Sequence, residues 1–323
     1  MSQAAIKLAV VMDPIGSIKP AKDTTLAMLL AAQARGWTLF YLEQSDLYLR
    51  DGEARARSRQ LEVSDTPRNW FCFGEERDLG LGSVDVILMR KDPPFNMEYI
   101  YSTYVLDRAE QAGALVINRP QALRDANEKA YTAWFPQCCP PTLMTCDMAR
   151  IRQFLVEHKK IVLKPLEGMG GTLVFVIAEG DPNFSVVLET LTQHGTRLTI
   201  AQKYLPEISE GDKRILLIDG VPVPYALARV PAPGESRGNL AAGGNGIGVP
   251  LTDRDRWICG QVAHALRDKG LLFVGLDVIG DYLTEINVTS PTCARELDKL
   301  YGLNIAEQFM LVVARKLSEK RRI

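Results

Sequence analysis

The chain has 323 residues, which is too long for one minimal domain and long enough for two or three. Hydrophobic residues make up 46% of the sequence and charged residues 24%, so burial can offset the ordering entropy and disorder is excluded as the main state. The 38 Lys and Arg residues nearly balance the 39 Asp and Glu residues. The resulting net charge of −1 argues against a general nucleic-acid binder.

The cysteine and histidine patterns exclude two further classes. The six cysteines include no C-x-x-C pair, and their scatter along a chain of this size argues against a disulfide framework. The three histidines include no H-x-x-x-H pair, so zinc hydrolase chemistry is disfavoured as well. The N-terminus carries no secretory signal, and the longest apolar run falls far short of the ~20 residues of a membrane span. We therefore expect a soluble, cytoplasmic protein.

The first part of the chain alternates short apolar runs with helical patterns. Strands are expected at 6–13, 38–44, 84–92 and 115–119, and helices at 24–36 and 98–113. This alternation predicts an α/β domain with a mainly parallel sheet and helices on both of its faces. The more polar stretch 46–80 is expected to form an irregular hairpin with a mobile connection.

Beyond about residue 122 the pattern changes, because strands follow one another without intervening helices. Strands are expected at 160–165, 172–180 and 199–205, hairpins at 214–230 and 272–290, and helices at 182–195, about 252–269 and the C-terminus. The glycine-rich segment 231–249 is expected to have no secondary structure. Antiparallel strands mixed with helices indicate an α+β second half.

A glycine loop joins the first two of these strands, in the run Lys164-Pro-Leu-Glu-Gly168-Met-Gly170-Gly171-Thr172. Its glycines allow backbone N–H groups to approach phosphate oxygens closely. It is not a Walker A loop, since no G-K-[ST] closes it, and a strand follows it where a dinucleotide fingerprint would have a helix. A lysine just before such a loop suits a flap over a nucleoside triphosphate. An ordinary flexible hairpin turn is the alternative.

Two carboxylates and an amide occur on the apolar strands near the C-terminus. Glu285 and Asn287 are two residues apart and therefore face the same side of one strand. The Gly280-Asp281 turn can fold Asp277 back beside them. Three hard oxygen donors suit Mg²⁺ bridging nucleotide phosphates. The alternative is a pair of acids at a strand edge, satisfied by Lys or Arg.

Two further segments carry arginines where an anion could bind. Arg229 and Arg237 flank or lie in the glycine-rich segment, where they could clamp a carboxylate or phosphate, although a plain surface linker is the alternative. Arg90 and Lys91 end a strand of the first half, and ligands bind at the carboxyl ends of strands in open α/β sheets. A salt-bridged strand end is the alternative there.

Taken together, these stretches resemble the ATP-grasp superfamily and, within it, the bacterial-type glutathione synthetase family. The resemblance runs from about Lys7 to about Arg315, in order through VVMDPI, AMLLAAQARG, DLYLRDGEARA, VILMRKDPPF, NEKAYTAWF, LKPLEGMGG, RGNLAAGG, GLDVIGD and EINVTSPTC. It implies an ATP-grasp fold with an N-terminal, Rossmann-like preATP-grasp domain at 1–122, a central lid at 123–202 and a C-terminal catalytic domain at 203–323. It also implies a homotetramer.

The resemblance implies roles for the residues at matching positions around a bound ATP. Lysines would contact the phosphates, a loop would cover them, a hinge strand would border the adenine, and an aspartate would bind the ribose. The lysines are Lys129 and Lys164, and the loop consists of Gly168, Met169, Gly170, Gly171 and Thr172. The hinge strand holds Gln202, Lys203, Tyr204 and Leu205, and the aspartate is Asp212. Asp277, Glu285 and Asn287 match the Mg²⁺ ligands, with Mn²⁺ as an alternative ion.

The remaining matched residues would lie where the substrates react. Arg214 and Arg229 match positions near the transferred phosphate and the reacting carboxylate. Arg237 and Asn239 belong to a segment that resembles the closing substrate lid. The peptide substrate would be held by Arg90, Ser290 and Thr292.

The implied reaction is an ATP-dependent carboxylate–amine ligation. It joins γ-glutamylcysteine to glycine and gives glutathione, ADP and phosphate. A carboxylate is a poor electrophile, so the γ-phosphoryl group of ATP first converts it to an acyl phosphate, which the glycine amine attacks. Water must be excluded during this step, since it would hydrolyse the intermediate. No nucleophilic side chain is needed, so Cys293 is expected to be structural.

Two other functions stay as alternatives. Another carboxylate–amine ligase, such as a D-alanine–D-alanine or glutamate-adding ligase, would share the phosphate and metal residues and differ in MRKDPPF, RGNLAAGG and SPTC. A nucleotide-binding regulatory protein could keep the fold without turnover. A dehydrogenase is disfavoured because no strand–turn–helix glycine fingerprint lies near the N-terminus.

Overall fold

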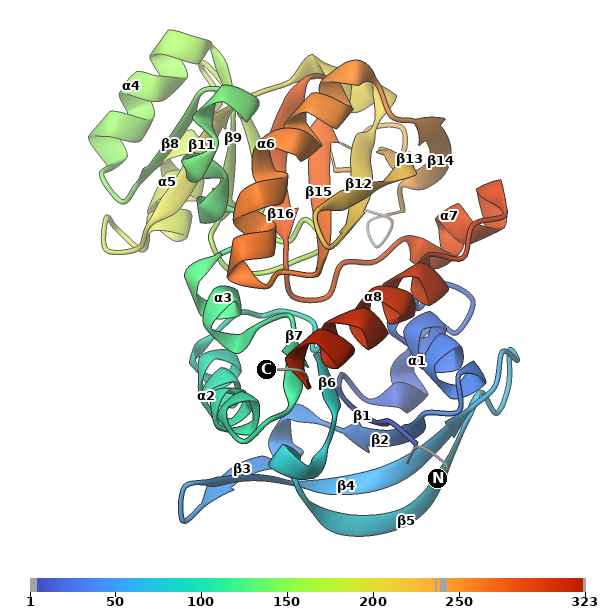
Figure 1. Ribbon diagram of the computed structural model, residues 1–323. Coiled ribbons are helices and arrows are strands. Elements are labelled where there is room, and N and C mark those ends of the chain that lie inside the picture. Colours follow the sequence, from blue (N-terminus) through green and yellow to red (C-terminus); the bar gives the residue numbers. More distant parts are fainter. Residues whose placement is uncertain (1–4, 236, 239–242, 322–323) are drawn as a thin grey trace.

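The computed structural model describes residues 5–235, 237–238 and 243–321. These residues form three β-sheets, one at the bottom of Figure 1 and two side by side at the top. Asn239, which the family resemblance assigns to the substrate, lies outside the described residues. Among the described helices, none has both the length and the apolar character that a bilayer crossing requires.

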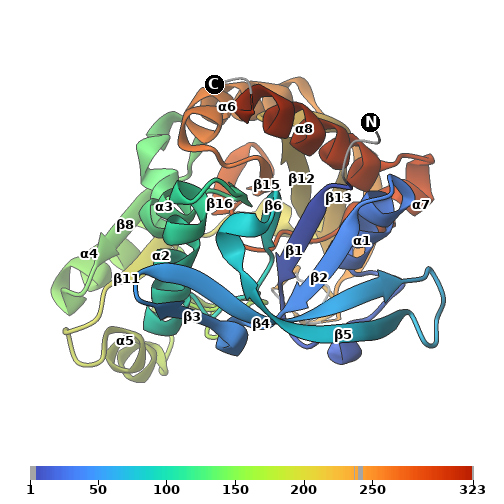
Figure 2. The ribbon, with the colours of Figure 1, turned by 60° about the horizontal axis from the view of Figure 1, so that its bottom comes forward.

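The bottom sheet has the parallel centre that the alternating pattern predicted. Its strand β1 (Lys7–Val11) lies between β2 (Thr38–Leu42) and β6 (Val86–Met89), and β6 pairs with β7 (Leu115–Ile117). Helix α1 (Thr24–Ala34) joins β1 to β2, and α2 (Met97–Gln111) joins β6 to β7. Because the two crossovers run in opposite directions from the sheet centre, their helices cover opposite faces, as Figure 2 shows.

The stretch 46–80 is more regular than expected. It holds three antiparallel strands, β3 (Leu47–Arg50), β4 (Glu53–Val63) and β5 (Phe71–Gly80), which extend the sheet beyond β2. The predicted hairpin is present as β4–β5, but the prediction of irregular structure was wrong. Charged side chains conceal the strand pattern because they pair across the ladder, as Arg55 does with Asp78 at 2.8 Å.

The upper left sheet of Figure 1 is antiparallel and has the strand order β10-β9-β11-β8. Its strands β9–β11 and its helix α5 were expected from the sequence, whereas β8 and α4 were not. One apolar cluster joins both helices to the sheet. The elements are β8 (Thr142–Thr145), α4 (Met148–His158), β9 (Lys160–Pro165), β10 (Phe175–Ala178), α5 (Phe184–Thr192) and β11 (Thr199–Lys203).

The upper right sheet has the order β14-β13-β12-β15-β16 and contains both predicted hairpins. The glycine-rich segment was expected to have no secondary structure, but its end forms the edge strand β14. Backbone pairing needs no apolar side chain, and a Cβ at Gly248 would lie 2.6 Å from the ring of Tyr301, so close packing requires glycine there. The elements are β12 (Asp212–Ile218), β13 (Val221–Val230), β14 (Asn245–Pro250), α6 (Asp253–Lys269), β15 (Phe273–Ile279) and β16 (Tyr282–Asn287).

The last two helices connect the upper right sheet to the bottom sheet. Helix α7 (Ala294–Tyr301) packs against β13 and β14, and α8 (Ile305–Lys320) returns to pack against α1 (Figure 1). Helix α3 (Pro120–Asp125) leads out of the bottom sheet. Two apolar clusters run from the bottom sheet into the upper right sheet, so these two parts share their cores. The domain limits at 122/123 and 202/203 stay a prediction.

Asn118 joins the bottom sheet to the upper right sheet. It lies just after β7 and is buried, with 4% of its surface exposed. Its Nδ2 donates to the carbonyls of Phe273 at 2.9 Å and Val288 at 2.6 Å, and its Oδ1 accepts from the backbone N–H groups of Leu272 at 2.8 Å and Phe273 at 3.1 Å. One side chain therefore satisfies backbone groups beside both β15 and β16.

We expect Asn118→Ala to lower the free energy of unfolding by about 3 kcal/mol, because it leaves buried backbone donors and acceptors without partners. Urea denaturation would measure the change. The exposed Asn183, whose side chain caps no helix N–H, provides the matched control. Asn183→Ala should change the unfolding free energy by less than about 0.5 kcal/mol. Equal effects of the two variants would contradict the role given to Asn118.

Candidate active site

A cavity of about 330 Å³ lies between the two upper sheets. Its walls come from β9, β10 and β11 on one side and from β12, β13, β15 and β16 on the other. Val162 and Val176, which lie opposite each other on β9 and β10, give the wall apolar surface together with Leu205 and Ile279. Gln202, Lys203, Tyr204 and Leu205, the predicted adenine residues, all line the cavity. A flat aromatic base fits such an apolar surface, with polar backbone at its edge.

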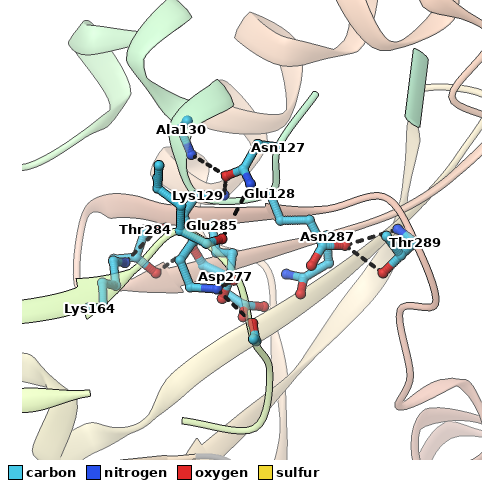
Figure 3. Close-up of polar contacts among 12 residues, drawn as sticks. Asn127, Glu128, Lys129, Ala130, Lys164, Asp277, Thr284, Glu285, Asn287 and Thr289 are labelled. Carbon is cyan, nitrogen blue, oxygen red and sulfur yellow. Dashed lines mark hydrogen bonds and ion pairs between the residues drawn. The ribbon is translucent and has the colours of Figure 1, made fainter. Parts of the chain in front are cut away.

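Two buried lysines meet at the middle of the cavity. The Nζ of Lys129 donates to the carbonyl of Gly168 at 2.9 Å and pairs with Glu285 at 3.1 Å, while that of Lys164 donates to the carbonyl of Thr284 at 3.2 Å (Figure 3). Burial lowers the pKa of Lys164. Burial would also lower the pKa of Lys129, but the charge and hydrogen bond of Glu285 outweigh it and raise that pKa. Two such ammonium groups favour an anionic ligand between them.

The predicted glycine loop lines the cavity beside these lysines. Residues Gly168 to Thr172 all contribute to the wall. Gly168, Gly170 and Gly171 have φ angles of 97°, 65° and 79°, in the left-handed region that favours glycine. The loop can therefore bring its backbone N–H groups towards phosphate oxygens at a distance that bulkier residues would prevent.

The β15–β16 hairpin places the predicted metal ligands together. Asp277 lies opposite Glu285, and Gly275 lies opposite Asn287, so the side chains are neighbours as the spacing predicted. Glu285 and Asn287 line the cavity. The Nδ2 of Asn287 donates to the carbonyl of Gly275 at 3.3 Å, which turns Oδ1 the other way.

The Asp277 carboxylate is not presented to the cavity. It is buried, and it binds Arg214 at 2.6 and 3.1 Å and Arg229 at 2.9 Å. Burial alone would raise its pKa, but the two guanidinium groups hold the pKa of Asp277 well below its usual range.

The donor set fits a divalent cation that also binds phosphate. Within the described residues, no three Asp, Glu, His or Cys side chains converge on one point. Mg²⁺ does not need such a cluster, because it is commonly held by one or two carboxylates together with water and substrate phosphates. Glu285 and Asn287 supply hard oxygens at the cavity wall, next to the two lysines.

Asp212 carries an unused acceptor at the cavity. Its Oδ2 pairs with Arg229, whereas its Oδ1 is buried and has no hydrogen-bond partner among the described residues. Burial raises the pKa of Asp212 to about 6, although the charge of Arg229 opposes this shift. An unpaired buried oxygen is costly, so the position is suited to a ligand hydroxyl, such as that of a ribose.

The other predicted residues divide into three groups. Arg214, Arg229, Arg237, Ser290 and Thr292 line the cavity. Asn239 lies outside the described residues. Arg90 does not line the cavity: it is buried, its Nε donates to the Thr25 hydroxyl at 3.1 Å, and its Nη2 donates to the carbonyl of Pro291 at 2.9 Å. The role of Arg90 in substrate binding stays a prediction.

Sequence reasoning missed Glu128 and Asp92, which both line the cavity. Glu128 Oε1 accepts from the backbone N–H of Val288 at 2.8 Å. It also accepts from the backbone N–H of Thr289 at 2.9 Å and from the Thr289 hydroxyl at 2.8 Å (Figure 3). Burial and then the charge of Glu285 raise the pKa of Glu128. The position of Glu128 next to Lys129 was the available signal.

Comparison with known proteins identifies the family. The family model of the prokaryotic glutathione synthetase N-terminal domain matches residues 6–124, and that of its ATP-grasp domain matches residues 128–302. The chain belongs to the prokaryotic glutathione synthetase family. It is 61% identical to a glutathione synthetase of Pseudomonas putida and 55% identical to one of Escherichia coli K12, in each case over 98% of this chain and 100% of the relative. It is therefore an ATP-dependent ligase that synthesises glutathione, and the predicted resemblance is confirmed.

More distant solved structures share the fold. A crystal structure of the D-cycloserine synthetase DcsG has a TM-score of 0.69 at 15% identity, covering 96% of this chain and 99% of the other. The ATP-grasp ligase PsnB, complexed with precursor peptide PsnA2 and AMPPNP, has a TM-score of 0.59 at 15% identity, covering 98% of each chain. The predicted ATP-grasp fold, with its α/β and α+β parts, is thus confirmed.

We expect Asp277→Asn to lower the free energy of unfolding by about 3 kcal/mol at pH 7, because Arg214 and Arg229 lose the charge that balances them. The pKa of Asp277 is lower in the folded chain, so its stabilisation is complete above the unfolded value of 3.8 and is lost as the pH falls below it. Urea titrations at several pH values would measure this.

Asp281, exposed in the turn of the same hairpin, is the matched control. Asp281→Asn should leave the unfolding free energy within about 0.5 kcal/mol of the unsubstituted chain. If Asp277→Asn were as stable as the Asp281 variant at pH 7, the charge balance described here would be refuted.

Proposed function

We propose that this cavity joins γ-glutamylcysteine to glycine, with ATP cleaved to ADP and phosphate through an acyl phosphate. The observation that carries the proposal is the convergence of four buried cations, Lys129, Lys164, Arg214 and Arg229, on a cavity between two sheets. Such a site can hold the charges of a nucleotide polyphosphate and a carboxylate close to one another. Like charges held this closely require cations that water does not screen.

ATP would lie along the cavity with its adenine against the apolar surface of the wall. Gln202 to Leu205 would border the base, and the free Oδ1 of Asp212 would accept a ribose hydroxyl. Lys129, Lys164 and the loop of Gly168 to Thr172 would then hold the phosphates. This orientation brings the terminal phosphate to the arginines.

The first chemical step would transfer the γ-phosphoryl group to the terminal carboxylate of γ-glutamylcysteine. Arg214 and Arg229 reach the cavity from β12 and β13 and would orient the carboxylate. Lys129 and Lys164 would balance the charge of the transferring group. The product is an acyl phosphate with a good leaving group.

We assign Asp277, Glu285 and Asn287 to Mg²⁺, with Mn²⁺ as an alternative. When bound, the ion neutralises phosphate charge as a Lewis acid. Glu285 and Asn287 already line the cavity, whereas Asp277 would have to give up an arginine contact to join them.

In the second step the glycine amine would attack the acyl carbon and phosphate would leave. Arg229 would stabilise the oxyanion of the tetrahedral intermediate. Arg237, in the segment after β13, donates to the carbonyl of Gly171 at 3.4 Å and so connects that segment to the glycine loop. That contact supports a role in excluding water from the acyl phosphate.

We also propose a cytoplasmic homotetramer, with a preATP-grasp domain at 1–122, a lid at 123–202 and a catalytic domain at 203–323. The division between the bottom sheet and the upper sheets supports the first boundary, since α3 leads from one to the others. Sedimentation of the purified chain would test the tetramer.

The function is tested by ADP release from Mg²⁺-ATP and γ-glutamylcysteine, with and without glycine, together with detection of glutathione. We expect glycine-dependent ADP formation matched by an equal amount of glutathione. ATP binding without turnover on this pair would reject the proposed substrates.

We expect Glu285→Gln to reduce kcat by about 100-fold or more, because it removes a metal ligand and the partner of Lys129. The melting temperature should stay within a few degrees of that of the unsubstituted chain, since the amide side chain keeps an oxygen that can accept a hydrogen bond. Steady-state assays over a range of Mg²⁺ concentrations would show a higher requirement for the ion. Glu62→Gln, on the exposed side of β4, is the control and should behave like the unsubstituted chain. Unchanged turnover of the Glu285 variant would refute the metal assignment.

A further inference from the structure

Asp92 brings a carboxylate from the bottom sheet into the cavity. It follows β6, and Asp92 and Pro93 are the only described lining residues that come from the chain before Glu128. On the same part of the wall lie Ser290 and Thr292, which follow β16. Burial raises the pKa of the Asp92 carboxyl and hydrogen bonding to Ser290 opposes this shift, so the two side chains are close to each other. Asp92 therefore reaches the cavity from the bottom sheet, whereas the predicted adenine residues belong to β11 and the segment after it.

The positively charged side chains next to Asp92 in the sequence, Lys91 and Arg90, bind groups other than the Asp92 carboxylate. Asp13 Oδ1 pairs with Lys91 Nζ at 2.8 Å, and Asp13 Oδ2 accepts the backbone N–H of Asp92 at 2.9 Å. Lys91 Nζ also donates to the carbonyl oxygen of Asp92 at 2.8 Å. Arg90 is held by Thr25 and the carbonyl of Pro291. The backbone of Asp92 is thus anchored, while its carboxylate forms no ion pair with any residue that the structure describes.

Each of the other carboxylates that line the cavity in the described part of the chain has a positively charged or backbone partner for at least one of its oxygens. Asp212 pairs with Arg229, and Glu285 pairs with Lys129. Glu128 accepts two backbone N–H groups and a hydroxyl. Among the described residues, the Asp92 carboxylate has hydrogen bonding to Ser290 and no positively charged partner within ion-pair distance. Burial raises its pKa, and the charges of Asp13 and Asp23 add to this against the opposing effects of Ser290 and Arg90. The surroundings of Asp92 therefore favour an additional positive charge.

We propose that Asp92 binds the α-ammonium group of the acid substrate and selects for acids that carry one. This rests on the proposed function, because γ-glutamylcysteine carries a free α-amino group on its glutamyl residue. That ammonium is separated from the reacting carboxylate by the whole γ-glutamyl chain, so it can stay charged throughout the reaction. The glycine amine is a poorer match, since an ion pair with Asp92 would keep it protonated and prevent its attack.

The test is a cycle of two proteins and two substrates. The unsubstituted chain and Asp92→Asn are each assayed with γ-glutamylcysteine and with N-glutarylcysteine, which lacks only the α-amino group. The unsubstituted chain should prefer the first substrate by about 10- to 100-fold in kcat/KM, the range of a charge-assisted hydrogen bond. Asp92→Asn should lose about that factor on γ-glutamylcysteine and little on N-glutarylcysteine, so that the preference disappears.

Two variants accompany the cycle. Asp92→Glu keeps the charge and should retain most of the preference. Glu98→Gln removes an exposed negative charge from α2, outside this cavity, and should retain all of it. The KM values for ATP and glycine should not change in Asp92→Asn, because neither ligand uses the Asp92 carboxylate.

Several outcomes would overturn the proposal. Equal use of both acids by the unsubstituted chain would overturn it. This result needs no variant, so it holds even if Asp92→Asn fails to fold. Equal losses on both acids would assign Asp92 a structural role, and a selective rise in the KM for glycine would assign it to the glycine amine. Failure of the unsubstituted chain to make glutathione would instead reject the proposed function itself.

Discussion

The buried Asp277 carboxylate lies between the buried guanidinium groups of Arg214 and Arg229, and the site depends on this charge balance. An unpaired charge in such a place would cost several kcal/mol. The balance is set by strand register, since Arg214 on β12 lies opposite Asp277 on β15, which in turn lies opposite Glu285 on β16. The backbone ladder therefore fixes which charges meet before any ligand is present.

The same row of side chains extends from one upper sheet to the other. Glu285 pairs with Lys129, and Lys129 donates to Gly168 in the loop after β9 (Figure 3). The glycine loop and Lys129, which are assigned to phosphate, are thus connected through Glu285 to the strands that carry Asp277 and its arginines. A nucleotide in the cavity would meet cations whose positions are already determined, so little of its binding energy is needed to order them.

The bottom sheet completes the site from outside. Asn118 bonds it to the strands that carry the catalytic side chains, and shared apolar clusters make the junction continuous. Strand β6 ends towards the cavity and delivers Asp92 to its wall. Parallel sheets bind ligands at the carboxyl ends of their strands, and here that edge is closed by a second sheet. Two anionic substrates, a carboxylic acid and a polyphosphate, can meet at such a junction.

Local patterns in the sequence determined most strands and helices, the glycine loop and the β15–β16 hairpin, because turns and two-residue periodicity involve only near neighbours. The family, and with it the reaction, also followed from motifs that can be read in order. Tertiary structure alone decided the orientation of several charged side chains. Asp277 turns to its arginines, Arg90 to Pro291, and Asp92 to the cavity, because these orientations depend on partners far away in the chain. The formation of β14 also depends on tertiary structure. This glycine-rich edge strand has no hydrophobic periodicity, and it forms because it pairs with β13 and packs against Tyr301.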